Sequence, residues 1–156
     1  MGAPQAKLPA AGAELVTVSI GAQQFAIEIV AVREIRGWTS STPLPHAPSH
    51  FLGMINLRGS ILPVIDLGAR LGLGVTRADS SSVVVVVQIG ERQVGLLVDA
   101  VCDIHAVTEG LLQRPPDVGA GASHDFVNGV MTTEQGIVSL LRLDNIIPAE
   151  ADEAAA

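Results

Sequence analysis

The sequence has no tyrosine and a single cysteine, Cys102. One thiol cannot form an internal disulfide, which fits a reducing compartment such as the cytoplasm. Aromatic residues make up only 3% of the chain, so valine, isoleucine, leucine and alanine must fill the core. Because the β-branched residues among these favour strands, the composition indicates a β-rich protein.

Basic residues are also scarce. The chain has 9 lysines and arginines against 16 aspartates and glutamates, and its isoelectric point is about 4.9. Binding along a phosphate backbone needs clustered lysine and arginine side chains. The composition therefore argues against a nucleic-acid partner and against binding to an anionic membrane surface.

Long apolar runs are absent as well. The longest, Val83–Val87, is far short of the roughly 20 residues that a membrane-spanning helix needs. The first residues, MGAPQAKLPAAGAE, contain no apolar segment of the signal-peptide type. We therefore expect a soluble, cytoplasmic protein without direct membrane insertion.

Motifs that carry chemistry are missing too. His46 and His50 stand four residues apart, but Pro48 lies between them and no third metal ligand is near. There is no Gly-x-Ser-x-Gly motif, and Cys102 is interpreted as a small buried apolar residue rather than a nucleophile. The sequence thus predicts no catalytic site, no metal and no cofactor, and it favours a protein that binds other proteins.

What the sequence does contain is alternation of apolar and polar residues with a period of two. Residues 14–29 alternate in two runs around a glycine-containing turn, which predicts a β-hairpin. A second hairpin is predicted by two apolar arms, Phe51–Leu57 and Ile61–Leu67, around Arg58-Gly59, where the glycine supplies a positive φ. A short helical turn follows, and Asp66 can cap its start.

The second half of the chain repeats this pattern. Residues 20–35 lie over residues 89–104 without a gap and share Ile, Gly, Gln, Ala, Val and Ile at matched positions. Phe51–Leu67 lies over Phe126–Leu143 with one inserted residue. These matches predict an internal duplication of hairpin, crossover and hairpin. Two such units suggest two small barrels packed together, because closure removes exposed sheet edges.

The predicted boundaries follow from composition. Residues 1–13 are rich in alanine, proline and glycine and are predicted to be a disordered leader, and the acidic residues 149–156 a disordered tail. Between them, residues 14–148 are predicted to form one domain. Its two intertwined subdomains would span roughly 14–75 and 82–148.

Several stretches are distinctive in combination: GMINLRGSILPVIDL, VAVREIRGW, QVGLLVDAVCDI, RPPDV and FVNGVMTTEQGIVSLLRLDNII. Together they resemble the CheW family, the receptor–kinase coupling proteins of bacterial chemotaxis, from Glu14 to Ile147. The resemblance implies an all-β fold with short helices, built as two small five-stranded, SH3-like β-barrels around a shared core. It also implies a non-catalytic adaptor in signal transduction. Its partners would be the cytoplasmic tip of a methyl-accepting chemoreceptor and the regulatory domain of a CheA-type histidine kinase.

The resemblance also suggests site residues. Glu34 of EIRG and Arg58 of NLRG match family positions that are important for coupling, and we predict that they form an ion pair. The receptor-binding residues implied by the resemblance are Val32, Glu34, Ile35 and Arg58. For the kinase we expect apolar anchors at Leu44, Gly53 and Met54. The apolar residues among these could equally be plain core, and Arg58 could be a solvated turn residue.

Other interpretations stay open. Within the same class, the chain could be a coupler of another chemosensory system, such as one that governs pilus motility or biofilm formation. In a different class, a small β-barrel enzyme or ligand-binding domain would have a deep pocket with converging polar groups, whereas a coupler would have a shallow apolar groove. In the second unit Thr132-Thr133 replaces Asn56-Leu57, so only the first unit carries the arginine motif.

Overall fold

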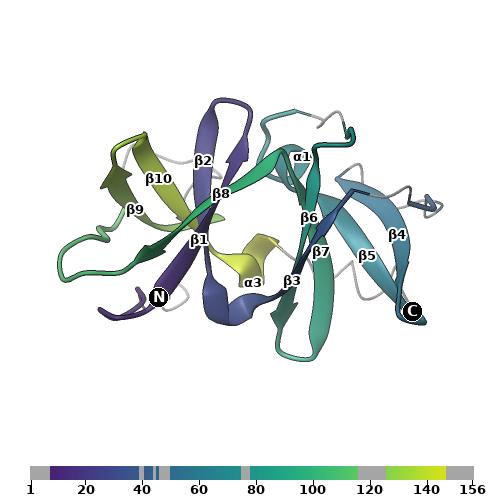
Figure 1. Ribbon diagram of the computed structural model, residues 1–156, viewed down its shortest axis with the longest axis horizontal. Coiled ribbons are helices and arrows are strands. Elements are labelled where there is room, and N and C mark those ends of the chain that lie inside the picture. Colours follow the sequence, from purple (N-terminus) through teal and green to yellow (C-terminus); the bar gives the residue numbers. More distant parts are fainter. Residues whose placement is uncertain are drawn as a thin grey trace, which may run out of the picture.

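The computed structural model describes residues 8–38, 41–43, 45, 50–74, 78–115 and 126–146. Along these residues the chain forms two five-stranded sheets that lie side by side (Figure 1). Sheet A has the strand order β8 (Ala100–Ala106), β1 (Glu14–Ile20), β2 (Gln23–Glu28), β10 (Gly136–Leu141) and β9 (Val127–Thr133). Sheet B has the strand order β3 (Val32–Gly37), β6 (Val83–Ile89), β7 (Arg92–Val98), β5 (Ser60–Asp66) and β4 (Phe51–Leu57). The short helices are η1 (Ile29–Ala31), α1 (Leu67–Arg70) and α3 (Leu143–Ile146).

The predicted hairpins and helical turn are present. β1 pairs with β2 and β4 pairs with β5, both antiparallel. The side chain of Asp66 caps α1 by accepting a hydrogen bond from the backbone nitrogen of Ala69 at 3.3 Å. The prediction of a mostly-β fold with short helices is therefore confirmed.

The two halves of the chain exchange strands. Each half contributes its first hairpin to one sheet and its remaining strands to the other. Neither 14–75 nor 82–148 therefore builds a sheet of its own. When β1–β5 are matched in turn to β6–β10, the strand order of sheet A becomes that of sheet B. This correspondence supports the duplication inferred from the sequence.

The matched strands also share their register. The parallel pairing of Leu140 with Ala26 in sheet A corresponds to that of Val64 with Gly95 in sheet B. A β-bulge interrupts β3 opposite β6, and a β-bulge interrupts β8 opposite β1 at the matching place. Bulges re-aim the side chains next to them, so they are features that a duplicated unit would carry in both copies.

Neither sheet is closed by the strand pairing that the structure describes. β8 and β9 are the edge strands of sheet A, and β3 and β4 are those of sheet B. The prediction of closed barrels is therefore not confirmed. An isolated bridge between Thr42 and Met54 covers the outer edge of β4, and one between Gln113 and Val130 covers that of β9.

The main core lies between the two sheets and draws on both. Its buried members include Val16, Val18 and Ile27 of sheet A and Ile65, Val85 and Leu96 of sheet B. Smaller apolar clusters lie within each sheet, around Ile55 in sheet B and around Met131 in sheet A. Burial of apolar side chains from both sheets in one cluster holds the halves together as one body.

Residues 8–13, which the sequence assigned to the leader, pack on sheet A. Leu8 and Ala13 contact the apolar cluster around Met131, and the backbone nitrogen of Gly12 donates to the carbonyl of Val107 at 2.8 Å. The prediction that the leader extends to residue 13 is therefore wrong for these residues. Residues 1–7 and the predicted tail lie outside the described residues.

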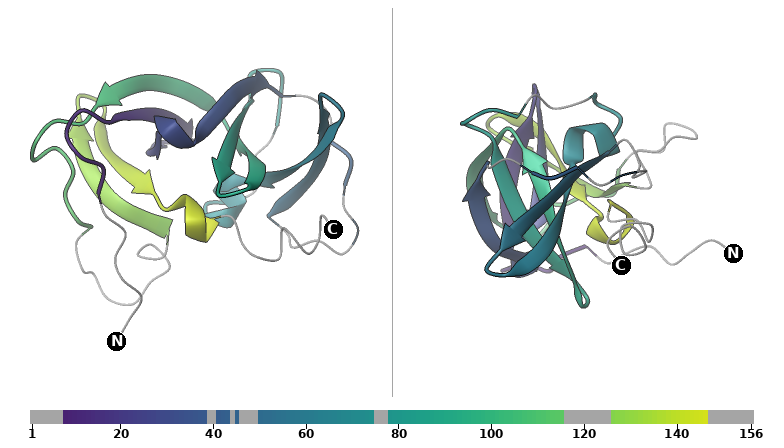
Figure 2. Two further views of the ribbon diagram at one scale, coloured as in Figure 1. Left: turned by 90° about the horizontal axis from the view of Figure 1, so that it is seen from below. Right: turned by 90° about the vertical axis from the view of Figure 1, so that its right-hand side faces the viewer.

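Arg70 ties the two halves at their short helices, which lie between the sheets (Figure 2). Its Nε donates to the carbonyl of Ile146 at 3.0 Å and its Nη2 donates to that of Asn145 at 2.9 Å. Its guanidinium carbon also lies 4.9 Å from the centre of the Phe126 ring. A cation at the C-terminal end of a helix satisfies carbonyls that have no helical partner, so α1 of the first half caps α3 of the second.

Candidate functional site

We call the space between the two edge strands of a sheet its seam. Seam B lies between β3 and the β4–β5 hairpin, and seam A lies between β8 and the β9–β10 hairpin. In seam B, Nη1 of Arg58 lies 3.1 Å from Oε1 of Glu34, and Nη2 lies 3.4 Å from Oε2. Nη1 of Arg36 donates to Oε2 of the same carboxylate at 2.9 Å. The predicted pair of Glu34 and Arg58 is confirmed, and Arg36, which sequence reasoning missed, joins it.

The turn between β4 and β5 aims Arg58 at β3. Both central residues have positive φ, 53° at Arg58 and 87° at Gly59, which is the pattern of a type I′ turn. The side-chain oxygen of Asn56 accepts a hydrogen bond from the backbone nitrogen of Gly59 at 2.9 Å and braces the turn. An arginine in the left-handed region carries backbone strain on the order of 1 kcal/mol. The strained residue is thus the one whose guanidinium reaches across the seam to Glu34.

The pair is buried on one side only. The side chain of Glu34 is 20% exposed, whereas that of Arg58 is 76% exposed. An ion pair with so exposed a partner contributes about 0–1 kcal/mol to stability. Glu34 also keeps Arg36 when Arg58 is removed. The contact therefore contributes little to the stability of the fold, and most of the Arg58 side chain stays exposed while it is paired.

The two apolar candidates on β3 have different surroundings. Val32 is half-buried and packs against the main core. Ile35 is 47% exposed, because successive residues of a strand point to opposite faces and Glu34 takes the inner one. Ile35 thus offers apolar surface on the outer face of β3, at the position next to Glu34.

The candidates on β4 are organised around the preceding loop. Gly53 is buried, and a Cβ there would lie 2.6 Å from the carbonyl oxygen of Thr42. Met54 exchanges two backbone hydrogen bonds with Thr42, each of 2.8 Å. Gly53 therefore allows the close approach of the loop rather than presenting a side chain. Leu44 lies outside the described residues.

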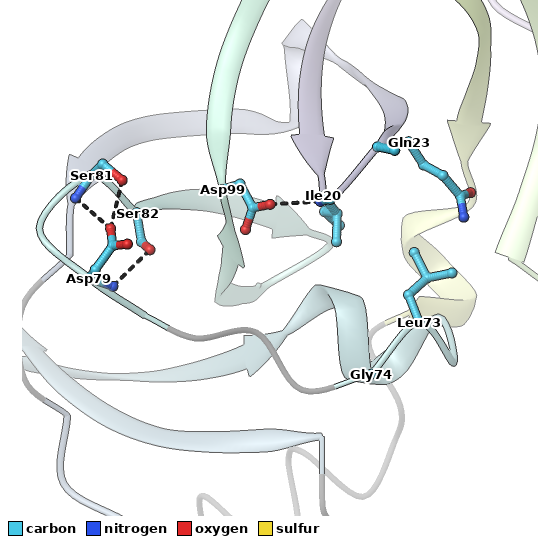
Figure 3. Close-up of a pocket in the computed structure, with 10 residues that line it drawn as sticks. Ile20, Gln23, Leu73, Gly74, Asp79, Ser81, Ser82 and Asp99 are labelled. Carbon is cyan, nitrogen blue, oxygen red and sulfur yellow. Dashed lines mark hydrogen bonds between the residues drawn. The ribbon is translucent and has the colours of Figure 1, made fainter.

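A hollow of about 640 Å³ lies beside the turn between β1 and β2 (Figure 3). The carboxylate of Asp79 accepts hydrogen bonds from the backbone nitrogen and hydroxyl of Ser81, and these bonds lower its pKa. The carboxylate of Asp99 accepts one from the backbone nitrogen of Gly21 at 2.6 Å. Both carboxylates are therefore hydrogen-bonded within the chain's own turns, and they point in different directions.

Other candidates from the sequence are placed as follows. Cys102 is exposed, so its prediction as a buried residue is wrong; it is the unpaired residue of the bulge in β8. Trp38 is half-buried against the cluster around Ile55. His46 lies outside the described residues. Among those that are described, no group of three or more His, Cys, Asp or Glu residues is placed to hold a metal ion. None of the helices that the structure describes has the length and apolar character of a membrane span.

The chain has clear relatives among known proteins. A chemotaxis protein CheW of Rhizobium meliloti is 46% identical over 144 residues, which cover 92% of this chain and 93% of the relative. A probable chemotaxis protein CheW of Rhizobium etli is 42% identical over 142 residues, 91% of this chain and 92% of the relative. The crystal structure of the scaffolding protein CheW of Thermoanaerobacter tengcongensis matches with a TM-score of 0.76 and 31% identity, and the match covers 84% of this chain and 89% of that one.

The family model of the CheW-like domain matches residues 14–151. This range contains both sheets and both seams, so the match is not confined to the arginine motif. With the sequence matches and the shared fold, it gives one consistent assignment. The chain belongs to the CheW family.

Proposed function

We propose that the chain is a non-catalytic adaptor that couples the cytoplasmic tips of methyl-accepting chemoreceptors to a CheA-type histidine kinase. The observation that carries this proposal is the Glu34–Arg58 contact across seam B, with Ile35 exposed at the next position of β3, in a chain of the CheW family. The chain itself performs no reaction. It acts in the cytoplasm and is recruited to the inner face of the membrane through the receptors.

Seam B is proposed as the receptor surface. Arg58 offers an exposed guanidinium to polar groups of the receptor, and Ile35 offers apolar contact from the outer face of β3. Val32 supports β3 from the core side. The contact network contains two guanidinium groups and one carboxylate, so it is locally positive in a chain whose net charge is −7. Such a positive spot favours a receptor surface that bears acidic groups.

The kinase surface is proposed at β4 and the loop before it. Met54 is half-buried, and Gly53 lets residues 41–43 lie against the strand. Leu44 belongs to the same proposed surface by its place in the sequence. Coupling then results because two partners bind one rigid body, and the adaptor need not change conformation.

The proposal is tested by sedimenting the protein with receptor-containing membranes and the kinase, and by measuring kinase activity in the pellet. Wild type is expected to enter the pellet and to activate the kinase. Arg58→Ala is expected to lose both, although its unfolding curve stays close to that of wild type. Arg33→Ala serves as the matched control, because Arg33 is an exposed arginine of β3 that donates to Gln88 outside the seam.

Each possible outcome tests a different part of the proposal. If wild type recruits neither receptor nor kinase, the coupling function is wrong. If Arg58→Ala recruits and activates normally, the function stands and Arg58 is only a turn residue. If Arg33→Ala fails as Arg58→Ala does, a general loss of positive charge, rather than the seam contact, explains the defect.

A further inference from the structure

Arg36 takes part in the seam B network from within the strand that carries Glu34. The two residues stand two positions apart on β3, so their side chains extend from the same face of the strand. Nη1 of Arg36 donates to Oε2 of Glu34 at 2.9 Å. Because one strand supplies both residues, this contact does not depend on where the β4–β5 hairpin lies.

Arg36 and Arg58 share one oxygen of this carboxylate. Nη1 of Arg58 lies 3.1 Å from Oε1, but its Nη2 lies 3.4 Å from the Oε2 that Arg36 also bonds. A complete two-bond contact between an arginine and a carboxylate has donor–acceptor distances of about 2.7–2.9 Å. The shorter bond to the shared oxygen belongs to Arg36, and Arg58 is left with an incomplete contact.

The two arginines also differ in exposure. The side chain of Arg36 is 36% exposed and that of Arg58 is 76% exposed, whereas that of Glu34 is 20% exposed. A carboxylate that is mostly buried is costly to leave without a cation. Arg36 meets this need from β3, so Arg58 can move away without leaving the charge of Glu34 unpaired.

We propose that Arg36 is a positioning residue of the receptor surface. By holding Oε2 of Glu34, it keeps Arg58 from completing its contact there, and Arg58 exchanges Glu34 for a carboxylate on the chemoreceptor tip. Two guanidinium groups on one carboxylate leave a net positive charge, which favours an acidic group of the receptor as the new partner. The inference rests on the proposed function, since it names the receptor as the protein that takes Arg58.

The first test follows the Arg58 side chain in the free protein, through the NMR relaxation of its Nε nitrogen. Arg36→Met keeps the apolar stem and removes the donors, so Arg58 gains both oxygens of Glu34 and its order parameter is expected to rise. Arg36→Lys restores a cation on Glu34 and should return the order parameter toward the wild-type value. A purely structural role for Arg36 would give the opposite change, a less ordered Arg58 in Arg36→Met.

The second test titrates each variant with receptor-containing membranes and measures the fraction that sediments. Arg36→Met is expected to bind about fivefold more weakly, because Arg58 must now give up a complete ion pair to reach the receptor. Arg36→Lys and the matched control Arg33→Met should bind within about twofold of wild type. If Arg36→Met does not fold, Arg36→Gln takes its place in both tests.

Arg58→Lys separates this role from a direct contact of Arg36 with the receptor. A lysine cannot form a two-bond contact with Glu34, so in that background Arg36→Met should cause little further loss of binding. An undiminished loss there would mean that Arg36 itself binds the receptor, and it would overturn the inference. If Arg58→Lys is not recruited at all, the order parameter of Arg58 decides between the two roles.

The outcomes separate this inference from the proposed function. Failure of wild type to sediment with the membranes would reject the proposed function, and the role of Arg36 with it. If wild type sediments, equal recruitment of Arg36→Met would overturn the role of Arg36 alone. A fall in the order parameter of Arg58 in Arg36→Met, or no change, would also overturn it.

Discussion

The β4–β5 and β9–β10 hairpins occupy equivalent places in the two sheets, but their turns have different backbones. In sheet B the positive φ values fall on Arg58 and Gly59, at the two central positions. In sheet A the positive φ, 116°, falls on Gly136, after the central pair Glu134-Gln135. The first pattern is that of a type I′ turn, and the second is that of a type I turn followed by a glycine in a bulge. The two hairpins share one topology, but the residue at the first central position of the turn, Arg58 or Glu134, points in a different direction in each.

This difference shows where duplicated halves can diverge. Strand order, parallel register and bulge positions are shared by the two sheets. The divergence lies in the turn and in charge: seam B contains Glu34 with Arg36 and Arg58, while Asp103 and Glu134 stand in seam A. A backbone that is fixed by core packing can therefore carry side chains of opposite charge at matched places.

The largest expected effect compares the loops that cover β4 and β9. A Cβ at Gly53 would lie 2.6 Å from the carbonyl oxygen of Thr42, which is backbone. A Cβ at the matching Gly129 would lie 2.8 Å from the tip of Leu8, which can move, and 3.1 Å from the backbone carbonyl oxygen of Gln113, a looser contact than at Gly53. Gly53→Ala is therefore expected to lower the free energy of unfolding by about 2–3 kcal/mol, and Gly129→Ala by clearly less.

Urea denaturation of the two variants measures this comparison. Gly37→Ala is the control, because a Cβ there meets nothing within 4 Å and Gly37 has an ordinary φ. It should change the free energy of unfolding by no more than roughly 0.5 kcal/mol. Equal losses for Gly53→Ala and Gly129→Ala would mean that both loops are held with the same rigidity.

The second expected effect concerns the hydrogen bonds that join the two short helices. The first half donates them, and the second half has no equivalent donor at the matching position. Arg70 of α1 caps α3, whereas the matching position in the second half is Ile146. Arg70→Met keeps the apolar stem and removes two hydrogen bonds from a charged donor. We expect a loss of about 2 kcal/mol in the free energy of unfolding, read from chemical denaturation. A loss as small as that of Arg33→Met, whose bond is exposed, would contradict the role of Arg70 as a tie between the halves.

The third compares the interiors of the sheets at one matched position, Ala26 in sheet A and Gly95 in sheet B. A Cβ at Gly95 would lie 2.7 Å from Cγ1 of Val84, a stiff side chain in the core. Gly95→Ala is expected to cost about 1–2 kcal/mol through overpacking. The reverse change, Ala26→Gly, should cost about 1 kcal/mol through backbone entropy. Thermal unfolding of both variants checks this, and a stabilised Gly95→Ala would show that sheet B adjusts without strain.

The smallest expected effect compares the backbone conformations of the two turns. Arg58→Gly and Arg58→Ala both lose the ion pair, but only glycine relieves the positive φ. We expect the glycine variant to be more stable than the alanine variant by about 1 kcal/mol. At Glu134, where φ is not positive, the order should reverse. Equilibrium denaturation of the four variants gives the comparison, and the same order at both turns would mean that their backbones do not differ as described.

Much of the fold could be predicted because its signals are local. Alternation predicted the hairpins, and Asp66 before an apolar helical turn predicted its cap. The exchange of strands between halves could not be predicted, because it depends on which hairpins bury one another. The packing of residues 8–13 was missed for a similar reason: Leu8 stands in an alanine- and proline-rich stretch whose composition indicates disorder.

The sequence predicted which two residues pair at the site, but it did not predict the geometry of the turn that holds Arg58. The contact of Glu34 with Arg58 followed from the family resemblance, but the sequence assigned positive φ to the glycine alone, and the structure gives it to Arg58 as well. Cys102 was expected inside because a free cysteine usually behaves as a small buried apolar residue. The bulge adds an unpaired residue to β8, which shifts the alternation and turns Cys102 to solvent. Alternation read from sequence fails wherever a bulge resets it.

The exchange of strands also sets an order for synthesis on the ribosome. All strands of sheet B come from one continuous segment, β3 to β7, whereas sheet A needs β1 and β2 from the beginning of the chain and β8 to β10 from the end. Sheet B can therefore complete its pairing while the last strands of sheet A are still being translated. During that interval the β1–β2 hairpin waits with both edges unpaired, and such edges invite pairing with other chains. The nascent chain is thus most vulnerable to misassociation at the β1–β2 hairpin, which is made before the other strands and finds its last partner only after β10 has been made.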